Sequence, residues 1–278
     1  MKILISGNKG QLGREITKQT NSDEYSITGA DIDELDITDF NATDLFVSNI
    51  KPDVIINCSA YTNVDACEDN ESLAFKVNAS GARNLSLCAK KIGAKIVHIS
   101  TDYVFDGNAT KPLKEYDNIS PINKYGESKE YGERLVRETN EKHFILRTSW
   151  LYGDGNNFVK TMLKLSETRD NLDVVDDQVG SPTSTVDLAK CILELVSTEL
   201  YGTYHATNEG VCSWYDFAKK IFELKGIDMM VNRVNSEQFK RKAKRPAYSV
   251  LENFMLNVEG KNCFRHWEES LEEYLKNL

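Results

Sequence analysis

The alternation of strand-like and helix-like segments in the first half of the chain is the feature that most limits its fold. Short apolar runs at 2–6, 53–60 and 95–100 alternate with longer amphipathic stretches at 11–19 and 71–92. Strands and helices that alternate at this spacing predict a parallel sheet with helices on both faces. We therefore predict an α/β fold of the Rossmann type, with a doubly wound parallel sheet.

The same pattern predicts further elements along the chain. Strands are expected at 25–30, 144–148, 174–175 and 202–206, and helices at 39–50, 124–138, 158–168, 185–197, 214–224 and 267–276. Part of the inner face of the 71–92 helix is expected to carry Leu73, Val77, Leu85 and Cys88. The alternation weakens after Trp150. We predict a dinucleotide-binding domain over 1–150 and a smaller α/β substrate-binding lobe over 151–278, whose strands can return to the main sheet.

A glycine-rich turn joins the first strand to the first helix. Gly7-Asn8-Lys9-Gly10-Gln11-Leu12-Gly13 reads G-x-x-G-x-x-G. Small residues at this place let the backbone approach a pyrophosphate, whose charge then lies at the helix N-terminus with its free N–H groups. The spacing differs from the G-x-G-x-x-G of many dehydrogenases. Because the turn occupies the N-terminal strand–turn–helix position, it predicts a nicotinamide dinucleotide site.

Two charged positions give opposite indications about that cofactor. Asp31 ends the second predicted strand, with Asp33 close behind, and a carboxylate there binds ribose hydroxyls and repels a 2′-phosphate. This favours NADH. Lys9, inside the glycine turn, can instead pair with a 2′-phosphate, which favours NADPH. Both cofactors stay open at this point.

A tyrosine and a lysine form the candidate catalytic pair. Tyr125 and Lys129 stand four residues apart on a predicted helix and therefore share one face. A neighbouring ammonium lowers the pKa of a phenol and prepares it for proton transfer near neutral pH. Ser100-Thr101-Asp102 lies at the C-terminal end of the preceding strand, where ligands bind in open α/β sheets. A hydroxyl at this edge can hold a substrate carbonyl oxygen beside the phenol.

Composition excludes several other classes of protein. The 278 residues carry a formal net charge of −9, which argues against nucleic acid as a partner. The apolar runs are strand-sized, so we expect neither a membrane span nor a signal peptide. The four histidines show no metal-ligand spacing, and we assign no metal ligand. The six cysteines are scattered without a C-x-x-C, which is typical of reduced thiols in a cytoplasmic protein.

Motifs along nearly the whole chain carry a resemblance to a known family. The chain closely resembles the dTDP-4-dehydrorhamnose reductases of the extended short-chain dehydrogenase/reductase superfamily. The most specific shared segment is Thr101-Asp102-Tyr103-Val104-Phe105-Asp106-Gly107. The others are Gly10-Gln11-Leu12-Gly13, Leu35-Asp36-Ile37-Thr38-Asp39, Ala60-Tyr61-Thr62-Asn63-Val64-Asp65 with Glu68, Val77-Asn78-Ala79, Tyr125-Gly126-x-x-Lys129-x-x-Gly132-Glu133, Arg147-Thr148-Ser149-Trp150-Leu151-Tyr152-Gly153, Asp177-Gln178-x-Gly180-x-Pro182-Thr183 and Arg245-Pro246-x-x-Ser249-x-Leu251.

The resemblance implies a role for individual residues. Thr101, Asp102 and Trp150 match positions that contact the sugar, and a flat aromatic face suits the C–H surface of a sugar ring. Arg245 and its basic neighbours are candidates for the nucleotide diphosphate. With Gly7 and Gly13 of the turn, the residues expected to hold the cofactor are Gly10, Gln11, Leu12, Asp31, Asp36, Ile37, Ala60, Tyr61, Thr62, Tyr125 and Lys129.

The resemblance also implies the reaction. Reduced nicotinamide would give hydride to C4 of dTDP-4-dehydro-L-rhamnose, Tyr125 would donate the proton, and Thr101 would bind the carbonyl oxygen as charge develops. The product would be dTDP-L-rhamnose, a cell-surface polysaccharide precursor. No metal is needed for this step. Some family members are dimers with Mg²⁺ held by glutamates, and Glu15 matches one such position. We favour a solvated Glu15, and expect a monomer or a homodimer.

Two alternative functions stay open. A reductase that makes the other C4 epimer would carry the same residues. A non-catalytic regulatory protein, like the regulatory subunit of methionine adenosyltransferase, would keep the fold and the nucleotide, but here Thr101, Tyr125 and Lys129 are all present. A dehydratase is disfavoured, since such relatives usually place a glutamate after Thr-Asp, where this chain has Tyr103.

Overall fold

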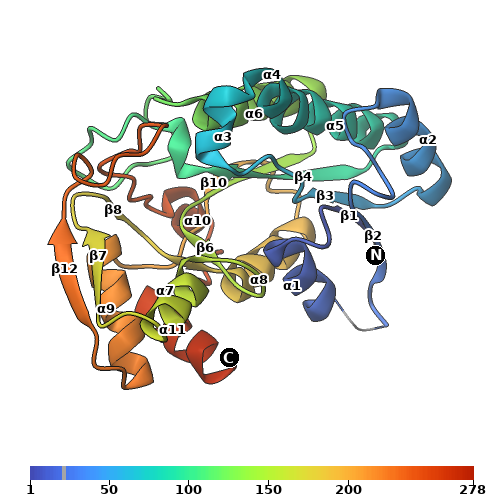
Figure 1. The fold of residues 1–278 in the computed structure, drawn as a ribbon. Coiled ribbons are helices and arrows are strands. Elements are labelled where there is room, and N and C mark those ends of the chain that lie inside the picture. Colours follow the sequence, from blue (N-terminus) through green and yellow to red (C-terminus); the bar gives the residue numbers. More distant parts are fainter. Residues whose placement is uncertain (21–22) are drawn as a thin grey trace.

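Six parallel strands form the central sheet of the computed structural model, which describes residues 1–20 and 23–278 (Figure 1). The chain passes from β1 to β2 on one side of β1 and resumes with β3 on its other side. The winding therefore reverses between β1 and β3, and ligands of open α/β sheets bind at the carboxyl ends of strands at such a point. The strands, in their order across the sheet, are β10 (Gly202–His205), β5 (His143–Thr148), β4 (Lys95–Thr101), β3 (Val54–Asn57), β1 (Lys2–Ser6) and β2 (Ser26–Ala30).

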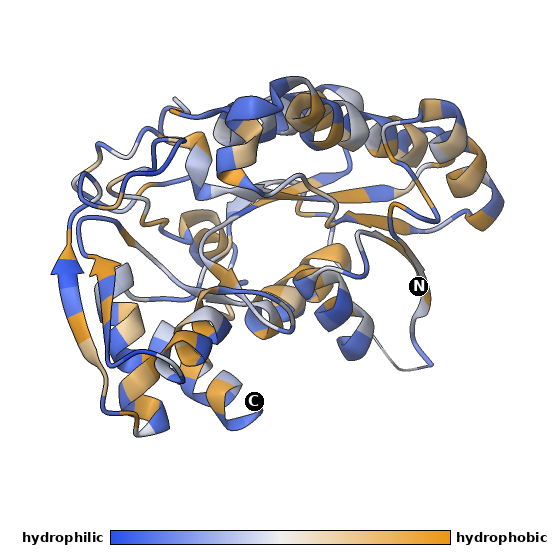
Figure 2. Cartoon of the chain, viewed as in Figure 1, coloured by the Kyte–Doolittle hydropathy of each residue, from blue (hydrophilic) through white to orange (hydrophobic). Residues whose placement is uncertain are grey.

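Helices cover both faces of this sheet because successive strand residues point to opposite sides. Ile3 and Ile5 pack in one hydrophobic cluster, whereas Leu4 packs in the other. Figure 2 shows hydrophobic residues running along these strands between the two helical layers. The helices on the first face are α1 (Gln11–Gln19), α8 (Thr185–Val196) and α10 (Phe254–Val258), and those on the second are α2 (Phe40–Ile50), α5 (Ala82–Ile92) and α6 (Lys124–Thr139). This arrangement confirms the predicted doubly wound parallel sheet.

A smaller lobe is built mainly from the second half of the chain. Its core is aromatic, with Phe217 and Trp267 packed edge to face at 5.7 Å between ring centroids. In Figure 1 this lobe lies at the lower left, below and beside the main sheet. Its main elements are α7 (Phe158–Ser166), β7 (Asn171–Val175), α9 (Trp214–Lys225), β12 (Met230–Val234) and α11 (Trp267–Lys276). Two short strand pairs complete it: β6 (Leu151–Tyr152) pairs with β9 (Thr183–Ser184), and β8 (Val179–Gly180) pairs with β11 (Cys212–Ser213).

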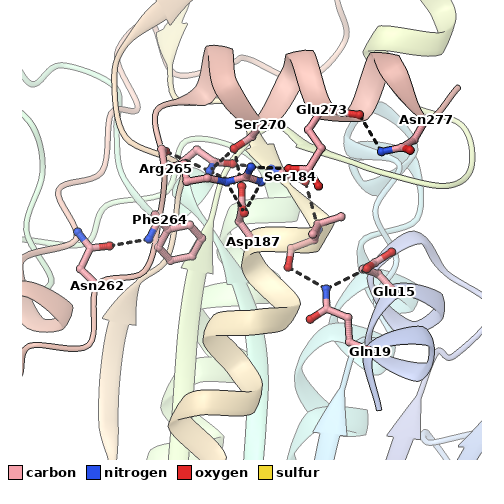
Figure 3. A network of polar contacts seen from close by, with 12 residues as sticks. Glu15, Gln19, Ser184, Asp187, Asn262, Phe264, Arg265, Ser270, Glu273 and Asn277 are labelled. Carbon is pink, nitrogen blue, oxygen red and sulfur yellow. Dashed lines mark hydrogen bonds and ion pairs between the residues drawn. The ribbon is translucent and has the colours of Figure 1, made fainter. Parts of the chain in front are cut away.

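The two halves of the chain are interwoven. Although α8 and β10 follow residue 150, they complete the main sheet and its lower helical layer. Figure 3 shows how the segment that precedes α11 is tied to α8: the Arg265 guanidinium donates to Asp187 Oδ1 at 2.7 and 3.1 Å. Asp187 is buried, so this pair holds the lobe against the sheet. The boundary at residue 150 stays a prediction.

One predicted helix differs from the structure. The 71–92 segment consists of α4 (Glu71–Phe75), a π-helical turn η1 (Lys76–Gly81) and α5. Leu73, expected on the inner face, is 44% exposed, whereas Leu85 and Cys88 are buried. A π-turn adds one residue to the helix, so the residues before and after it do not share one continuous face.

Short elements were absent from the prediction. They are α3 (Val64–Asp69), the 3₁₀ turn η2 (Asp102–Val104), α10, β12 and the two-residue strands. In contrast, α1 and α11 have the predicted bounds. Across 1–20 and 23–278, no helix combines the length and the apolar character that a membrane crossing requires.

Candidate active site

The glycine turn lies at the reversal point of the sheet and brings the backbone of β1 close to that of β3. Gly7 has a φ of +71°, and a Cβ on it would lie 2.8 Å from the Ser59 backbone N. A Cβ on Gly13 would lie 2.5 Å from the Gly7 carbonyl O. No side chain caps α1 at Gly10, so the first amides of this helix are free to receive an anion. Both glycines are therefore required by the close packing of the turn.

Three neighbouring cavities follow the carboxyl edge of the strands. The Asp31 cavity, of about 290 Å³, lies beside β2 and is lined by Gly7, Gly10, Asp31, Asp36, Ile37 and Ala60 among others. The Tyr125 cavity, of about 470 Å³, shares Gly10, Cys58 and Ala60 with it. The Arg245 cavity, of about 570 Å³, lies beyond, with Tyr103, Trp214, Arg241 and Arg245 in its wall. The first two cavities meet at the glycine turn, which fits an elongated dinucleotide with its pyrophosphate on α1.

The Tyr125 cavity brings together most of the predicted site residues. Its lining includes Gly10, Gln11, Leu12, Gly13, Ala60, Thr62, Thr101, Asp102, Tyr125, Lys129 and Trp150. Tyr61 is absent from the linings of these cavities. Its backbone N–H donates to Asn78 Oδ1 at 2.7 Å, and its carbonyl accepts from Asn78 Nδ2. We infer that Tyr61 contributes to the cofactor site through the backbone conformation of its loop, which the Asn78 side chain holds.

Tyr125 lies in the first turn of α6, which packs directly on the end of β4. Asn123 starts the helix, since its side-chain Oδ1 accepts the Gly126 N–H at 2.8 Å. Gly126 has no side chain, and any Cβ there would overlap the Tyr103 carbonyl oxygen. The Tyr125 and Tyr103 rings meet edge to face, with centroids 5.7 Å apart. This close approach places the phenol beside the residues that end β4.

Burial controls the charge state of the phenol. Burial raises the pKa of Tyr125 well above its ordinary value, against a smaller lowering by a side-chain hydrogen bond with Thr101. We had expected a nearby Lys129 ammonium to lower this pKa, and the structure gives the opposite direction. Burial is the largest cause, and Lys129 Nζ instead donates to the Ile99 carbonyl O at 2.6 Å. The phenol is therefore protonated at neutral pH.

Lys129 and Glu133 continue the buried face of α6 behind Tyr125. Burial lowers the pKa of Lys129 to about 8, and the Glu133 carboxylate acts in the opposite direction. Glu133 receives two hydrogen bonds from Arg147, both 2.9 Å long, and another from Ser100 Oγ. Burial alone would raise the pKa of Glu133, but the Arg147 charge and these hydrogen bonds lower it to about 2. A buried ion pair thus connects α6, β4 and β5.

Thr101 and Asp102 form the floor of the Tyr125 cavity at the end of β4. The Thr101 hydroxyl donates to Asp102 Oδ1 at 2.9 Å. Burial raises the pKa of Asp102 to about 6, against a smaller lowering by the neighbouring Ser249 and Thr101 hydroxyls. Asp102 Oδ2 is buried and has no hydrogen-bond partner within the described part of the chain. A polar group of a ligand can satisfy this oxygen.

Trp150 lines the Tyr125 cavity, and Trp214, which stacks on it, lines the Arg245 cavity. The Trp150 ring stacks on Trp214 with centroids 3.6 Å apart and planes 8° from parallel. Trp150 has a φ of +47°, a left-handed conformation that costs about 1–2 kcal/mol for a non-glycine residue. Gly180 makes room for the indole, since a Cβ there would lie 2.7 Å from the Trp150 ring. The stack and this glycine hold the indole face at the cavity edge.

Arg245 lies away from the catalytic pair. Its guanidinium donates to both carboxylate oxygens of Asp65, at 2.7 and 3.0 Å. Lys242 of the same basic run pairs with Asp69, so this run lies against the acidic helix α3. Arg241 and Arg245 also line the Arg245 cavity. Two residues of the basic run, Arg241 and Arg245, therefore line this cavity, and the charge of the run is partly balanced by α3.

Comparison with known proteins gives the family. The family described as RmlD substrate binding domain matches residues 1–278. The chain belongs to the RmlD family. It is 43% identical to the spore coat polysaccharide biosynthesis protein SpsK of Bacillus subtilis, over 99% of this chain and 97% of the relative. A crystal structure of a dTDP-4-dehydrorhamnose reductase from Clostridium acetobutylicum is 52% identical with a TM-score of 0.99, over 100% of this chain and 99% of that one. The Bacillus anthracis dTDP-4-dehydrorhamnose reductase, in complex with NADP, is 45% identical with a TM-score of 0.98, over the same shares.

Glu15 of this RmlD family member takes part in a polar network on α1. Its Oε1 accepts from Gln19 Nε2 at 2.9 Å, and the same nitrogen donates to the Val186 carbonyl O at 3.0 Å (Figure 3). In the residues that the structure describes, no group of three or more His, Cys, Asp or Glu side chains is arranged to hold a metal ion. Glu15 therefore helps to join α1 to α8.

Sequence reasoning missed several residues of the site. Glu133 and Asn78 stand in family motifs, but only the structure shows that Glu133 pairs with Arg147 and that Asn78 Nδ2 donates to Ser128 Oγ at 2.9 Å. Trp214 belongs to none of the motifs. A run of aromatic residues around 214–217 was the only available indication.

Proposed function

We propose that this protein reduces the C4 ketone of a dTDP-linked 4-keto-6-deoxy sugar with NADH or NADPH, converting dTDP-4-dehydro-L-rhamnose to dTDP-L-rhamnose. The observation that carries the proposal is the Tyr125 cavity, which places Thr101, Tyr125 and Lys129 beside the glycine turn. Relatives and solved structures named dTDP-4-dehydrorhamnose reductase support the choice of substrate.

The reduced nicotinamide, when bound, supplies hydride to C4 of the sugar. Tyr125 then donates its proton to the C4 oxygen, so that the ketone becomes an alcohol. The raised pKa of Tyr125 keeps the phenol protonated and suits this donor role. The Thr101 hydroxyl, which lines the same cavity as the phenol, positions the carbonyl oxygen and stabilises the charge that develops on it.

Lys129 acts from behind the phenol. Its pKa of about 8 keeps the ammonium charged at neutral pH. This charge, with the N–H groups of the glycine turn, favours the ribose and phosphate oxygens of the cofactor. Gly7, Gly10, Gln11, Leu12, Gly13, Asp31, Asp36, Ile37, Ala60, Tyr61 and Thr62 complete the proposed cofactor site.

The sugar lies against Trp150 and Asp102 in the same proposal. Asp102 has an unpartnered oxygen in the cavity, which can accept a hydrogen bond from a sugar hydroxyl. The dTDP portion extends past Trp150 into the Arg245 cavity, where Arg241 and Arg245 face its phosphates. We place this activity in the cytoplasm, where thiols stay reduced, because all six cysteines are free. The oligomeric state, monomer or homodimer, stays a prediction.

The deciding experiment follows the absorbance of NADH and NADPH in separate cuvettes after addition of dTDP-4-dehydro-6-deoxy-L-mannose generated in place. We expect oxidation by the wild type and loss of most turnover in Tyr125→Phe, with cofactor binding kept. Tyr116→Phe, at an exposed tyrosine, is the matched control. Near-normal rates in Tyr125→Phe would exclude Tyr125 as proton donor. NMR of the product distinguishes rhamnose from its C4 epimer.

Absence of oxidation in protein that binds cofactor would favour another keto sugar or the regulatory role.

A further inference from the structure

The Asp31 cavity has an acidic wall. Asp31 and Asp36 are the charged residues of its lining, which contains no Lys, Arg or His among the described residues. Asp31 is fixed from two sides, since Oδ2 accepts the Lys9 N–H at 3.2 Å and Oδ1 accepts the Ile32 N–H at 2.8 Å. A carboxylate fixed at the end of the second strand accepts hydrogen bonds from ribose hydroxyls.

Lys9 is the cation nearest in sequence to this wall, but its charge is already balanced. Its Nζ donates to Asp33 Oδ2 at 3.1 Å and to Glu34 Oε1 at 3.0 Å. Glu34 also accepts the Asp31 N–H at 3.0 Å, so these side chains form one connected loop. A 2′-phosphate that paired with Lys9 would have to displace two carboxylates and remain beside them.

The local charges therefore oppose a 2′-phosphate. Asp31, Asp33 and Glu34 supply three negative charges against the single positive charge of Lys9, while Arg14, which donates to the Lys9 carbonyl O at 2.8 Å, is paired with Asp154. A phosphate monoester brings a further charge of about −1.5 to −2 at neutral pH. A free ribose hydroxyl, in contrast, is neutral and can donate to Asp31. The same geometry thus accepts the ribose hydroxyl of NADH and repels the 2′-phosphate of NADPH.

We propose that this chain binds NADH in preference to NADPH, and that Asp31, Asp33 and Glu34 determine this preference. The proposal rests on the proposed function, because it concerns the same cofactor site. It does not follow from the family, since the Bacillus anthracis relative was crystallised in complex with NADP. The preference comes from the residues that this chain carries after β2.

The test measures cofactor binding without the sugar. NADH and NADPH are titrated into the wild-type protein, and the two Kd values are obtained from the fluorescence of the reduced nicotinamide. We expect the Kd for NADPH to exceed that for NADH at least about tenfold, because like charges placed side by side are costly. Equal or tighter binding of NADPH would overturn the proposal and leave the proposed function intact. Binding of neither cofactor would overturn both.

Salt gives a second readout with a definite sign. Added salt screens the repulsion between the carboxylates and the 2′-phosphate. The ratio of the NADPH Kd to the NADH Kd should therefore fall as salt rises, since effects on the shared pyrophosphate cancel in the ratio. A ratio that rises with salt would mean that the 2′-phosphate meets a net positive charge, and would contradict the proposal.

Variants assign the preference to residues. Asp33→Ser is a mild change, because Asp33 is 77% exposed and its side chain bonds Lys9. It should lower the Kd ratio severalfold, and Asp33→Ser with Glu34→Ser should lower it about tenfold. Glu141→Ser is the matched control, since Glu141 forms a similar exposed pair with Lys90, 3.3 Å long, near the amino end of β5. An equal change in the control and the double variant would refute the assignment.

Discussion

Breaking the buried pair of Glu133 and Arg147 should destabilise the protein strongly. Arg147→Met leaves a carboxylate whose exposed fraction is 0% without its main partner. Removal of one partner of a buried pair costs about 3–5 kcal/mol. Glu133 keeps its hydrogen bonds from Ser100 and Arg137, so we expect the lower end, about 3 kcal/mol. Urea denaturation followed by circular dichroism measures this loss in the free energy of unfolding.

Two further variants test the reasoning. Arg137→Met is the matched control, since Arg137 also contacts Glu133 but is 34% exposed, and such a pair contributes at most about 1 kcal/mol. In the double variant Glu133→Gln with Arg147→Met, neither charge of the buried pair remains. Its loss should therefore be smaller than the sum of the two single losses by about 2 kcal/mol. Additive losses would show that the two charges do not compensate each other.

Three more changes have defined outcomes. Lys129→Met should weaken cofactor binding, measured by nicotinamide fluorescence. We expect cofactor binding by the wild type to decline above about pH 8, where Lys129 loses its proton, and we expect the variant to lack this decline. A decline kept in the variant would exclude Lys129 as its cause. Arg245→Gln should raise KM for the nucleotide sugar about tenfold. Lys242→Gln is the control. Unchanged binding of dTDP by Arg245→Gln would show that Arg245 does not contact the diphosphate. Burial lowers the pKa of His205 to about 3 from an ordinary value of 6.5, so in this range the unfolded chain binds a proton that the folded protein does not. The free energy of unfolding should therefore fall with decreasing pH by about 1.4 kcal/mol per unit for this histidine, and His205→Asn should have a shallower slope.

Elements with local sequence patterns were predicted well. The helix expected at 39–50 begins at Phe40 because Asp39 Oδ1 accepts the Ala42 N–H, and α5 ends where Gly93 takes a φ of +75°. These features depend on neighbouring residues only. The polar strand β12, in contrast, exists because it pairs with β7 across nearly sixty residues, and its own sequence shows little alternation.

The site residues likewise include some that local sequence patterns predict and others that only long-range contacts determine. The glycine turn, Thr101 and the Tyr125–Lys129 pair follow from spacing within one element and from the position of strand ends. The contact of Arg245 with Asp65 joins residues 180 positions apart, and no local pattern predicts it. The raised pKa of Tyr125 was not predicted because its largest cause is burial, and burial depends on the whole fold.

The tryptophan stack makes this molecule its own optical sensor. Three tryptophans are present, and two of them, Trp150 and Trp214, lie face to face. Stacked indoles share their excited states, which produces a paired band in circular dichroism that vanishes when the rings separate. Trp150 follows a strand of the main sheet and Trp214 begins a helix of the smaller lobe. A ligand that moves the end of β5 relative to α9 would therefore change this band, and the change could be followed without any attached dye.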